Sequence, residues 1–411
     1  MNFCLLQAHA LLLLTALALA GCGQTLVDGI AEDGSATTLV ASAGEPSSVA
    51  SSLFALTTEN ESPMTLEHSE FGKTPDGQVI ELYTLKNTSG LTVKLINYGA
   101  TVVSVETPDS DGKVANIALG HQSLENWLAN PCYFGCTVGR FGNRIAGGVF
   151  GINDNIYTLA KNDGANHLHG GVNGFHKMLW TAEGSTAEDS ASVVFTRTSP
   201  DGEENYPGNL QVSVTYTLTE TNELKIHYTA TTDKPTVVNL TNHTYWNLTG
   251  NAAEQTVLDH ELTLNCNLYL PVNEQLIPTG DMAAVADTPM NFVAAHKVGD
   301  RIADVPGGYD HCFIVNRTID GLTQAARVYE PNSGRVMEVF TTEPGIQFYS
   351  GNFLNGQPAN GGFGKHHGFC LETQHYPDSP NQPHFPTTRL NPGETYETTT
   401  VHKFSVYKQA R

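Results

Sequence analysis

Basic residues are scarce in this chain of 411 residues. Lys and Arg together number 21, against 42 Asp and Glu, so the formal net charge is −21 at pH 7. A chain with this charge repels phosphate backbones and anionic lipid headgroups. We therefore expect no nucleic acid among its partners.

Charged residues of both signs are also few. They make up 15% of the sequence, whereas hydrophobic residues make up 40%. This composition can fill a sizeable core and argues against a disordered chain. The length is compatible with one large domain or with two small ones.

Cysteine is rare as well, with seven residues in the whole chain, two of them in the first 22 positions. The remaining five are too few for a disulfide scaffold, and their odd number leaves at least one thiol free. Most of them are expected to be small buried hydrophobes. They are Cys132, Cys136, Cys266, Cys312 and Cys370.

Long amphipathic helical patterns are nearly absent, and 39 Gly and 20 Pro favour short strands separated by turns. Residues 212–218 and 224–228 alternate between apolar and polar side chains, which predicts two antiparallel strands joined by a hairpin at 220–222. Further predicted strands are 91–106, 192–198, 236–240, 261–270, 311–315, 335–341 and 395–407. Strands at this density without alternating helices predict an all-β sandwich or barrel.

One long apolar run stands at the N-terminus, where residues 10–20 read ALLLLTALALA. It has the length of a signal-peptide core and is shorter than a spanning helix of about 20 residues, although no Lys or Arg precedes it. The run ends in Leu19-Ala20-Gly21-Cys22, which resembles the bacterial lipobox, in which the cysteine receives a diacylglycerol. We expect residues 1–21 to be a signal peptide and Cys22 to anchor an exported protein to a membrane of the bacterial cell envelope.

The next segment is rich in Ser, Ala, Thr and Gly and has no helical or strand periodicity up to about residue 63. This composition is typical of a linker. We predict a flexible tether over residues 22–63 and a catalytic domain over residues 64–411.

Two arginines and an asparagine lie among glycines in the segment 139–145, which reads GRFGNRI. Such a loop can offer a guanidinium group and an amide to several hydroxyls of one ligand. Taken alone, it is better explained by a turn whose arginines pair with surface carboxylates.

The segment 166–171 reads NHLHGG and places two histidines two residues apart. On a strand, His167 and His169 would point to the same face, so a metal site has to be considered, and zinc would need further ligands nearby. The alternative is a glycine-rich turn with one buried, hydrogen-bonded histidine.

A third motif, NLTNHTYWNL, covers residues 239–248. On a strand, His243 would share a face with Thr241, Tyr245 and Asn247. Such neighbours can tune the pKa of a histidine that donates a proton. A histidine that simply satisfies its hydrogen bonds in the core fits the motif equally well.

Polar residues in apolar surroundings recur towards the C-terminus, in GGYDH (307–311), PGIQFYSGN (344–352) and GFCLETQ (368–374). Glu372 follows an apolar stretch, where an ionisable carboxylate is costly unless it has a use. Carboxylates, amides and aromatic rings together suit a sugar site, since polar groups bind hydroxyls while rings cover the apolar face of a pyranose.

In their order, these motifs resemble those of the aldose 1-epimerase (galactose mutarotase) family, from roughly Met64 to the end of the chain. The resemblance implies a galactose mutarotase-like fold, a large antiparallel β-sandwich with an open sugar cleft, a free aldohexose substrate, and no cofactor or metal. It also implies Glu372 as general base and His243 as general acid, and leaves His167 outside the site. The residues implied to bind the sugar are Asn143, Arg144, His169, Asp310 and Gln347. The export signal and tether are absent from the commonest cytoplasmic relatives.

Interconversion of anomers needs a base at the C1 hydroxyl and an acid at the ring oxygen, and each positioned proton transfer is typically worth about 10²- to 10⁴-fold in rate. We expect Glu372 to be ionised and His243 to be protonated, because a nearby negative charge favours imidazolium.

Three other functions compete with this interpretation. A glycoside hydrolase would use two carboxylates, with Asp310 and Glu372 as candidates. A non-catalytic sugar-binding module would need neither an acid nor a base. A metalloenzyme could recruit His366, His367, Cys370 and His375.

Overall fold

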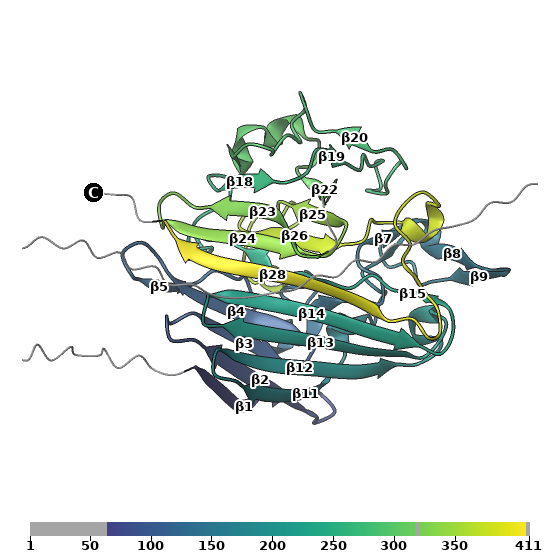
Figure 1. The fold of residues 1–411 in the computed structure, drawn as a ribbon, viewed down its shortest axis with the longest axis horizontal. Coiled ribbons are helices and arrows are strands. Elements are labelled where there is room, and N and C mark those ends of the chain that lie inside the picture. The colour runs from purple at the N-terminus through teal and green to yellow at the C-terminus, as the bar shows by residue number, and fades with distance from the viewer. Residues whose placement is uncertain (1–63, 318–320, 408–411) are drawn as a thin grey trace, which may run out of the picture. The chain divides into compact units, whose positions relative to one another are not determined.

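Antiparallel strands make up most of the regular structure in the computed structural model, which describes residues 64–317 and 321–407 (Figure 1). The predicted signal peptide, the predicted tether and Cys22 lie outside the described residues. One α-helix occurs in the described part, α1 (Leu124–Ala129), and Ser123 caps its N-terminus. Single 3₁₀ turns cover Ala146–Gly148, Phe175–Lys177, Glu203–Asn205, Val298–Asp300, Ile302–Asp304, Pro358–Asn360 and Ser379–Asn381.

The largest sheet has nine antiparallel strands in the order β11-β12-β13-β14-β28-β24-β23-β18-β21. Figure 1 shows the last long strand of the chain, β28, running between β14 and β24. The strands are β11 (Thr181–Thr186), β12 (Ser190–Ser199), β13 (Leu210–Thr219), β14 (Glu223–Thr232), β18 (Glu261–Leu264), β21 (His296–Lys297), β23 (Thr323–Tyr329), β24 (Arg335–Thr341) and β28 (Tyr396–Val406).

Two further antiparallel sheets lie against it. A five-stranded meander runs in chain order through β1 (Thr65–Lys73), β2 (Val79–Lys86), β3 (Thr92–Ile96), β4 (Thr101–Pro108) and β5 (Val114–Asn116). A six-stranded sheet has the order β17-β26-β25-β22-β19-β20. Its strands are β17 (Tyr245–Trp246), β19 (Leu268–Tyr269), β20 (Ala283–Ala284), β22 (Asp310–Ile314), β25 (Gly345–Tyr349) and β26 (Phe369–Gln374).

One hydrophobic core joins the three sheets. It contains Val214 of the nine-stranded sheet, Leu95 of the meander and Phe348 of the six-stranded sheet, all fully buried. In β13 the buried positions alternate with partly exposed ones, as expected for a strand with one face on a core. This packing of sheet on sheet is the β-sandwich that the sequence predicts.

Four short two-stranded ladders complete the described sheets. They pair β7 (Arg144–Ile145) with β10 (His167–Leu168), β16 (Thr241–Asn242) with β6 (Thr137–Val138), β15 (Thr236–Val237) with β27 (Arg389–Leu390), and β8 (Val149–Ile152) with β9 (Asn155–Thr158). Most predicted active-site residues lie in or beside these ladders and the strands β22, β25 and β26.

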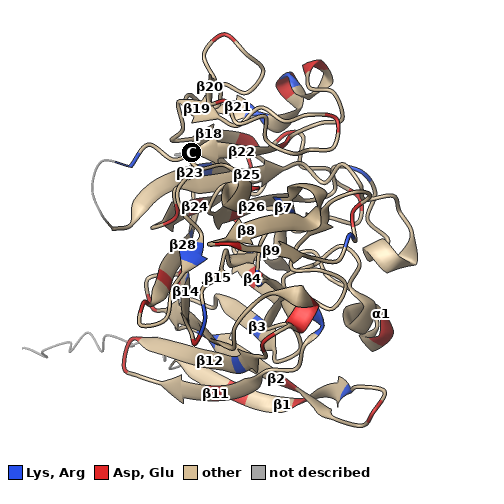
Figure 2. Cartoon of the chain, turned by 90° about the vertical axis from the view of Figure 1, so that its right-hand side faces the viewer, with Lys and Arg blue, Asp and Glu red and all other residues tan. Residues whose placement is uncertain are grey.

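Figure 2 shows the side of the body where α1 and the β8–β9 hairpin face the viewer, with Lys and Arg positions scattered among Asp and Glu. Within the described part of the chain, no helix combines the length and the apolar character needed to cross a bilayer.

Candidate active site

A cavity of about 560 Å³ collects most of the predicted functional residues. Six of the seven line it: Asn143, Arg144, His169, His243, Asp310 and Glu372. The seventh, Gln347, is not a lining residue, but its Nε2 donates a hydrogen bond to Oδ1 of the lining residue Asp310 at 2.7 Å.

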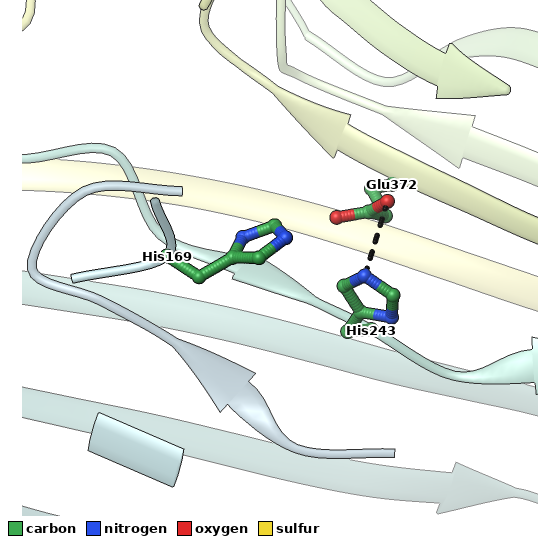
Figure 3. A group of neighbouring side chains, drawn as sticks. All are labelled: His169, His243 and Glu372. Carbon is green, nitrogen blue, oxygen red and sulfur yellow. Dashed lines mark ion pairs between the residues drawn. The ribbon is translucent and has the colours of Figure 1, made fainter. Parts of the chain in front are cut away.

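The central pair of the cavity is Glu372 with His243. Glu372 projects from β26, and His243 lies between β16 and β17, where its backbone bonds to Gly135 and Cys136 on both sides. His243 Nε2 is 3.6 Å from Glu372 Oε1, and the two side chains are 5% and 3% exposed (Figure 3). Glu372 Oε2 is buried without a hydrogen-bond partner among the described residues. An unpaired buried oxygen of this kind is a candidate ligand-binding atom.

Burial shifts the proton affinities of this pair in opposite directions. Desolvation raises the pKa of Glu372 well above its usual range, and the negative charge of Asp310 raises it further, against the opposing effect of Arg144. Desolvation lowers the pKa of His243 to about 4. Burial therefore favours a protonated Glu372 and a neutral His243, which is the reverse of our prediction. That prediction considered the attraction between the two charges and neglected the cost of removing both from water.

His169 presents a hydrogen-bond donor to the cavity. The ring Nδ1 accepts a hydrogen bond from the backbone N–H of Asn143 at 3.2 Å, and the backbone N–H of His169 donates to the Asn143 carbonyl at 3.1 Å. Desolvation holds the pKa of His169 well below its usual range, so the ring is neutral and its single proton lies on Nε2. Figure 3 shows this ring directed towards Glu372 and His243.

These three side chains are also close enough to be considered as metal ligands. One ligand atom from each of His169, His243 and Glu372 lies within 4.8 Å of the others, and this is the one such group in the described residues. A metal would need the Nε2 lone pair of His169, but the Asn143 N–H at Nδ1 places the ring proton on Nε2. The arrangement therefore suits hydrogen bonding to a ligand better than metal coordination.

The three histidines that a metalloenzyme could recruit make other hydrogen bonds in the structure. His366 and His367 bond through Nδ1 to the carbonyls of Ser350 and Ala252, each at 2.7 Å. His375 bonds through Nδ1 to a different carboxylate, that of Glu343, at 2.6 Å.

Arg144 and Asp310 give the cavity charged groups of both signs. Arg144 Nε donates to Asp163 Oδ2 at 2.8 Å, and the Arg144 backbone N–H donates to Asn143 Oδ1 at 2.9 Å. Desolvation raises the pKa of Asp310, while Arg144 and the hydrogen bond from Gln347 act against this increase. Carboxylate, guanidinium, amide and imidazole groups can thus reach several hydroxyls of one small ligand.

Comparison with known proteins agrees with this geometry. The sequence model of the family described as aldose 1-epimerase matches residues 81–403. The chain is 46% identical to human galactose mutarotase, over 82% of this chain and 97% of that protein. It is 39% identical to the aldose 1-epimerase of Escherichia coli strain K12, over 80% of this chain and 96% of that protein.

The chain belongs to the aldose 1-epimerase family. Its structure is similar to that of galactose 1-epimerase from Lactobacillus acidophilus, with a TM-score of 0.75 and 31% identity over 84% of this chain and 99% of that one. An aldose epimerase homologue from Caenorhabditis elegans gives a TM-score of 0.71 at 28% identity, over 84% of this chain and 100% of that one. The predicted all-β mutarotase-like fold, the epimerase function and the isomerase class are confirmed.

In this family member, the NHLHGG motif is a strand only over His167–Leu168. His169 has a left-handed backbone (φ 52°), which ends β10 after Leu168 and breaks the alternation of faces. His167 therefore points away from the cavity, where its nitrogens bond to the Ala160 carbonyl at 2.7 Å and the Tyr206 hydroxyl at 2.6 Å. The expectation that both histidines share a face is wrong, while leaving His167 out of the site agrees with the structure.

The two arginines of GRFGNRI also have different environments. Arg140 is buried and donates to carbonyl groups of the protein, including that of Ser199 at 2.8 Å, so it holds the loop in place. Only Arg144 lines the cavity. Arg144 does pair with a carboxylate, that of Asp163, whose side chain is 36% exposed and which also lines the cavity.

Two aromatic residues of this epimerase site, Tyr133 and Phe353, lie outside the motifs that indicate the site in the sequence. The Tyr133 ring packs against His169 and His176, with centroids 4.6 Å apart in both pairs, and against His243 at 5.8 Å. Phe353, 63% exposed, stacks on Tyr349 at 5.9 Å and also lines the cavity. Their positions beside the GRFGNRI and PGIQFYSGN motifs were the available signal, but a ring's direction is not readable from spacing.

Proposed function

We propose that this chain interconverts the α and β anomers of free aldohexoses such as glucose and galactose. The buried pair of Glu372 and His243, 3.6 Å apart in the cavity, is the observation that carries this proposal. The two oxygens that exchange protons in mutarotation are both bonded to C1. An acid and a base that serve them must therefore lie close together, as this pair does.

In the proposed mechanism, Glu372 accepts the proton of the C1 hydroxyl while His243 donates a proton to the ring oxygen. The bond between C1 and the ring oxygen breaks, and the aldehyde rotates about the C1–C2 bond. Ring closure then returns one proton from Glu372 to the C1 oxygen and one from the C5 hydroxyl to His243. No proton is gained or lost overall.

The opposite pKa shifts suit this cycle. The open-chain intermediate leaves Glu372 protonated and His243 neutral, which is the state that burial favours. Desolvation thus stabilises the protonation state of the open-chain intermediate relative to the ion pair from which ring opening starts.

We assign the sugar hydroxyls to Asn143, Arg144, His169 and Asp310. His169 offers its Nε2–H as a donor, Arg144 offers a guanidinium group, and the Asp310 carboxylate accepts. Gln347 acts by holding Asp310, and its buried Oε1 has no partner among the described residues.

Glycoside hydrolysis is less well supported. It needs two carboxylates on either side of the scissile bond. The titratable partner of Glu372 is His243 at 3.6 Å, whereas Asp310 lies on β22, with β25 between it and β26. Absence of aryl glycoside hydrolysis by the purified protein is the expected result.

Polarimetry tests the proposed activity. Freshly dissolved α-D-glucose and α-D-galactose should reach their equilibrium rotation faster with purified protein than in buffer alone. Equal rates with and without protein for both sugars would contradict the proposal.

We also propose that the protein is exported and held at the bacterial cell envelope by acyl chains on Cys22, with residues 22–63 as a tether and residues 64–411 as the catalytic domain. The apolar run at 10–20, the Leu19–Cys22 sequence and the Ser- and Thr-rich composition that follows support this location.

A further inference from the structure

Cys370 contacts the proposed catalytic acid, His243, at the ring nitrogen that does not face Glu372. Its Sγ is 3.6 Å from His243 Nδ1, while Glu372 lies at the other ring nitrogen. Cys370 and Glu372 are two residues apart on β26, so their side chains project from the same face. A single strand therefore supplies the neighbours of both nitrogens of His243.

The chemistry of the proposed function requires a particular tautomer of His243. The acid must lose its proton at Nε2, beside Glu372, and recover it there on ring closure. A neutral imidazole carries one N–H, so Nε2 has a free lone pair only when Nδ1 keeps its proton. A hydrogen-bond acceptor at Nδ1 would hold the ring in this tautomer.

We propose that Cys370 is a positioning residue for His243, with its sulfur accepting a hydrogen bond from Nδ1–H throughout the catalytic cycle. The opposite arrangement, with the thiol donating to Nδ1, would leave the proton of the neutral ring on Nε2. His243 could then not take back a proton from the sugar. This inference rests on the proposed function of His243.

A sulfur acceptor suits an acid that must release its proton readily. Sulfur is a weak acceptor, whereas a carboxylate or carbonyl at Nδ1 would stabilise the imidazolium more strongly. Desolvation lowers the pKa of His243 to about 4, and a weak acceptor preserves that effect.

The other groups around His243 carry no fixed charge that would hide a change at position 370. Desolvation lowers the pKa of His169 and raises the pKa of Tyr133 and of Tyr245, so these three groups are neutral near pH 7. His176, with its pKa lowered to about 3 by desolvation, is neutral as well. The groups that face His243 or act on it are Glu372 and Cys370 of β26, Tyr245 of β17, His169 after β10, and Tyr133 and His176.

The tautomer can be observed directly by ¹⁵N NMR of histidine-labelled protein, with the His243 signals assigned by their loss in His243→Asn. We expect a neutral His243 with its proton on Nδ1 in the parent, and a mixture of tautomers in Cys370→Ala. This measurement needs no activity, so it separates failure of the inference from failure of the proposed function. A parent ring with its proton on Nε2 would overturn the inference.

Kinetics provide the second measurement. Cys370→Ala should lower kcat roughly tenfold with little change in KM, as expected for loss of a group that orients a catalytic residue. Cys370→Ser places a stronger acceptor of similar size at Nδ1, which favours the imidazolium and raises the pKa of His243. The acidic limb of the plot of kcat against pH should therefore move to higher pH by roughly half a pH unit. The test still works if the alanine variant fails to fold, because the serine variant measures the same effect.

Cys136→Ala is the matched control. Cys136 is equally buried, but its Sγ bonds to the Tyr133 carbonyl at 3.2 Å instead of to an imidazole. It should keep the parent tautomer and the parent pH profile. Cys370 does not position His243 if both Cys370 variants retain the parent pH profile and a kcat within twofold of the parent. The same conclusion follows if Cys136→Ala shifts the pH profile as much as the Cys370 variants do.

Discussion

The chemistry of this site depends on a few residues whose surroundings differ sharply from water. Glu372 and His243 are almost fully buried, and burial moves the pKa of the carboxyl up and that of the imidazole down. His169 is held neutral by burial and is oriented by a backbone N–H. The fold therefore sets the protonation state of Glu372, because a glutamate in water is ionised near neutral pH.

A substitution of one residue, Arg144, tests the proposed binding site. Arg144→Lys keeps the positive charge but removes the planar fork of donors, including the Nε bond to Asp163. We expect KM for the sugar to rise roughly tenfold, since a hydrogen bond to a charged group is worth about 1.5 to 3 kcal/mol. Initial rates by polarimetry give this value.

Arg197→Lys serves as the control for that substitution. Arg197 pairs with Glu203 at 2.7 Å and does not line the cavity, so its KM should match the parent. An unchanged KM in Arg144→Lys would remove Arg144 from the binding site.

At the scale of elements, the GRFGNRI loop and the NHLHGG loop are in close contact where they carry Asn143 and His169. Gly170 has φ 80°, and a Cβ at this position would come within 1.8 Å of the Gly139 carbonyl oxygen. Only glycine allows this approach of the NHLHGG loop to the GRFGNRI loop.

Gly170→Ala should therefore destabilise the protein and slow catalysis, because the loops must move apart. Gly147→Ala is the matched control: it also has a positive φ, 62°, but its Cβ would meet nothing within 4 Å. We expect the control to lose about 1 kcal/mol from backbone strain alone. Urea unfolding should show a clearly larger loss for Gly170→Ala, and equal losses would refute the steric argument.

A buried junction between strands should make stability depend on pH. Burial alone would lower the pKa of His375, but the Glu343 carboxylate at 2.6 Å outweighs it and raises the pKa. Tyr396 donates to the same carboxylate at 3.1 Å, which links the ends of β24, β26 and β28.

Because the folded pKa of His375 is raised, its contribution is complete below the unfolded pKa of about 6.5 and is lost as pH rises through the folded value. The difference in unfolding free energy between the parent and His375→Gln should therefore be larger at pH 6 than at pH 9. Denaturation at both pH values measures it. A difference that is constant or larger at pH 9 would contradict the assignment.

The strands were the most predictable elements. The hairpin of β13 and β14 turns at 220–222 as alternation indicates, and the predicted strand 335–341 coincides with β24. The segment 91–106 forms two strands instead of one, since Gly99 and Ala100 adopt left-handed conformations that turn the chain. Apolar periodicity continues through such a turn, so it does not reveal the reversal.

The site was predictable as a set of residues and less so as an arrangement. The motifs identify Glu372 and His243, but the contact of Cys370 with His243 and the packing of Tyr133 arise from tertiary structure. The left-handed backbone at His169 separates it from His167, and although histidine adopts this conformation more often than most residues, it does so too rarely for the sequence to indicate it.

For the whole molecule, the similarity covers 97% of human galactose mutarotase and 99% of the Lactobacillus acidophilus enzyme, but 82% and 84% of this chain. If Cys22 is acylated, acyl chains anchor the protein at about 0.8 kcal/mol per buried methylene, without a spanning helix. Cys22→Ser should then move the protein from the membrane to the soluble fraction, or leave an unprocessed precursor, with unchanged mutarotation. Cell fractionation and N-terminal sequencing check this, and a soluble parent whose mature N-terminus is not Cys22 would exclude the lipid anchor.

The central claim is that Glu372 and His243 together exchange the two protons of mutarotation. Polarimetry of α-D-galactose with the parent, Glu372→Gln and His243→Asn, each with its fold checked by circular dichroism, tests it most directly. We predict that each substitution lowers kcat by about 10²- to 10⁴-fold, because each removes one proton-transfer group at nearly constant volume. A folded variant of either kind with a rate within a few fold of the parent would contradict the account.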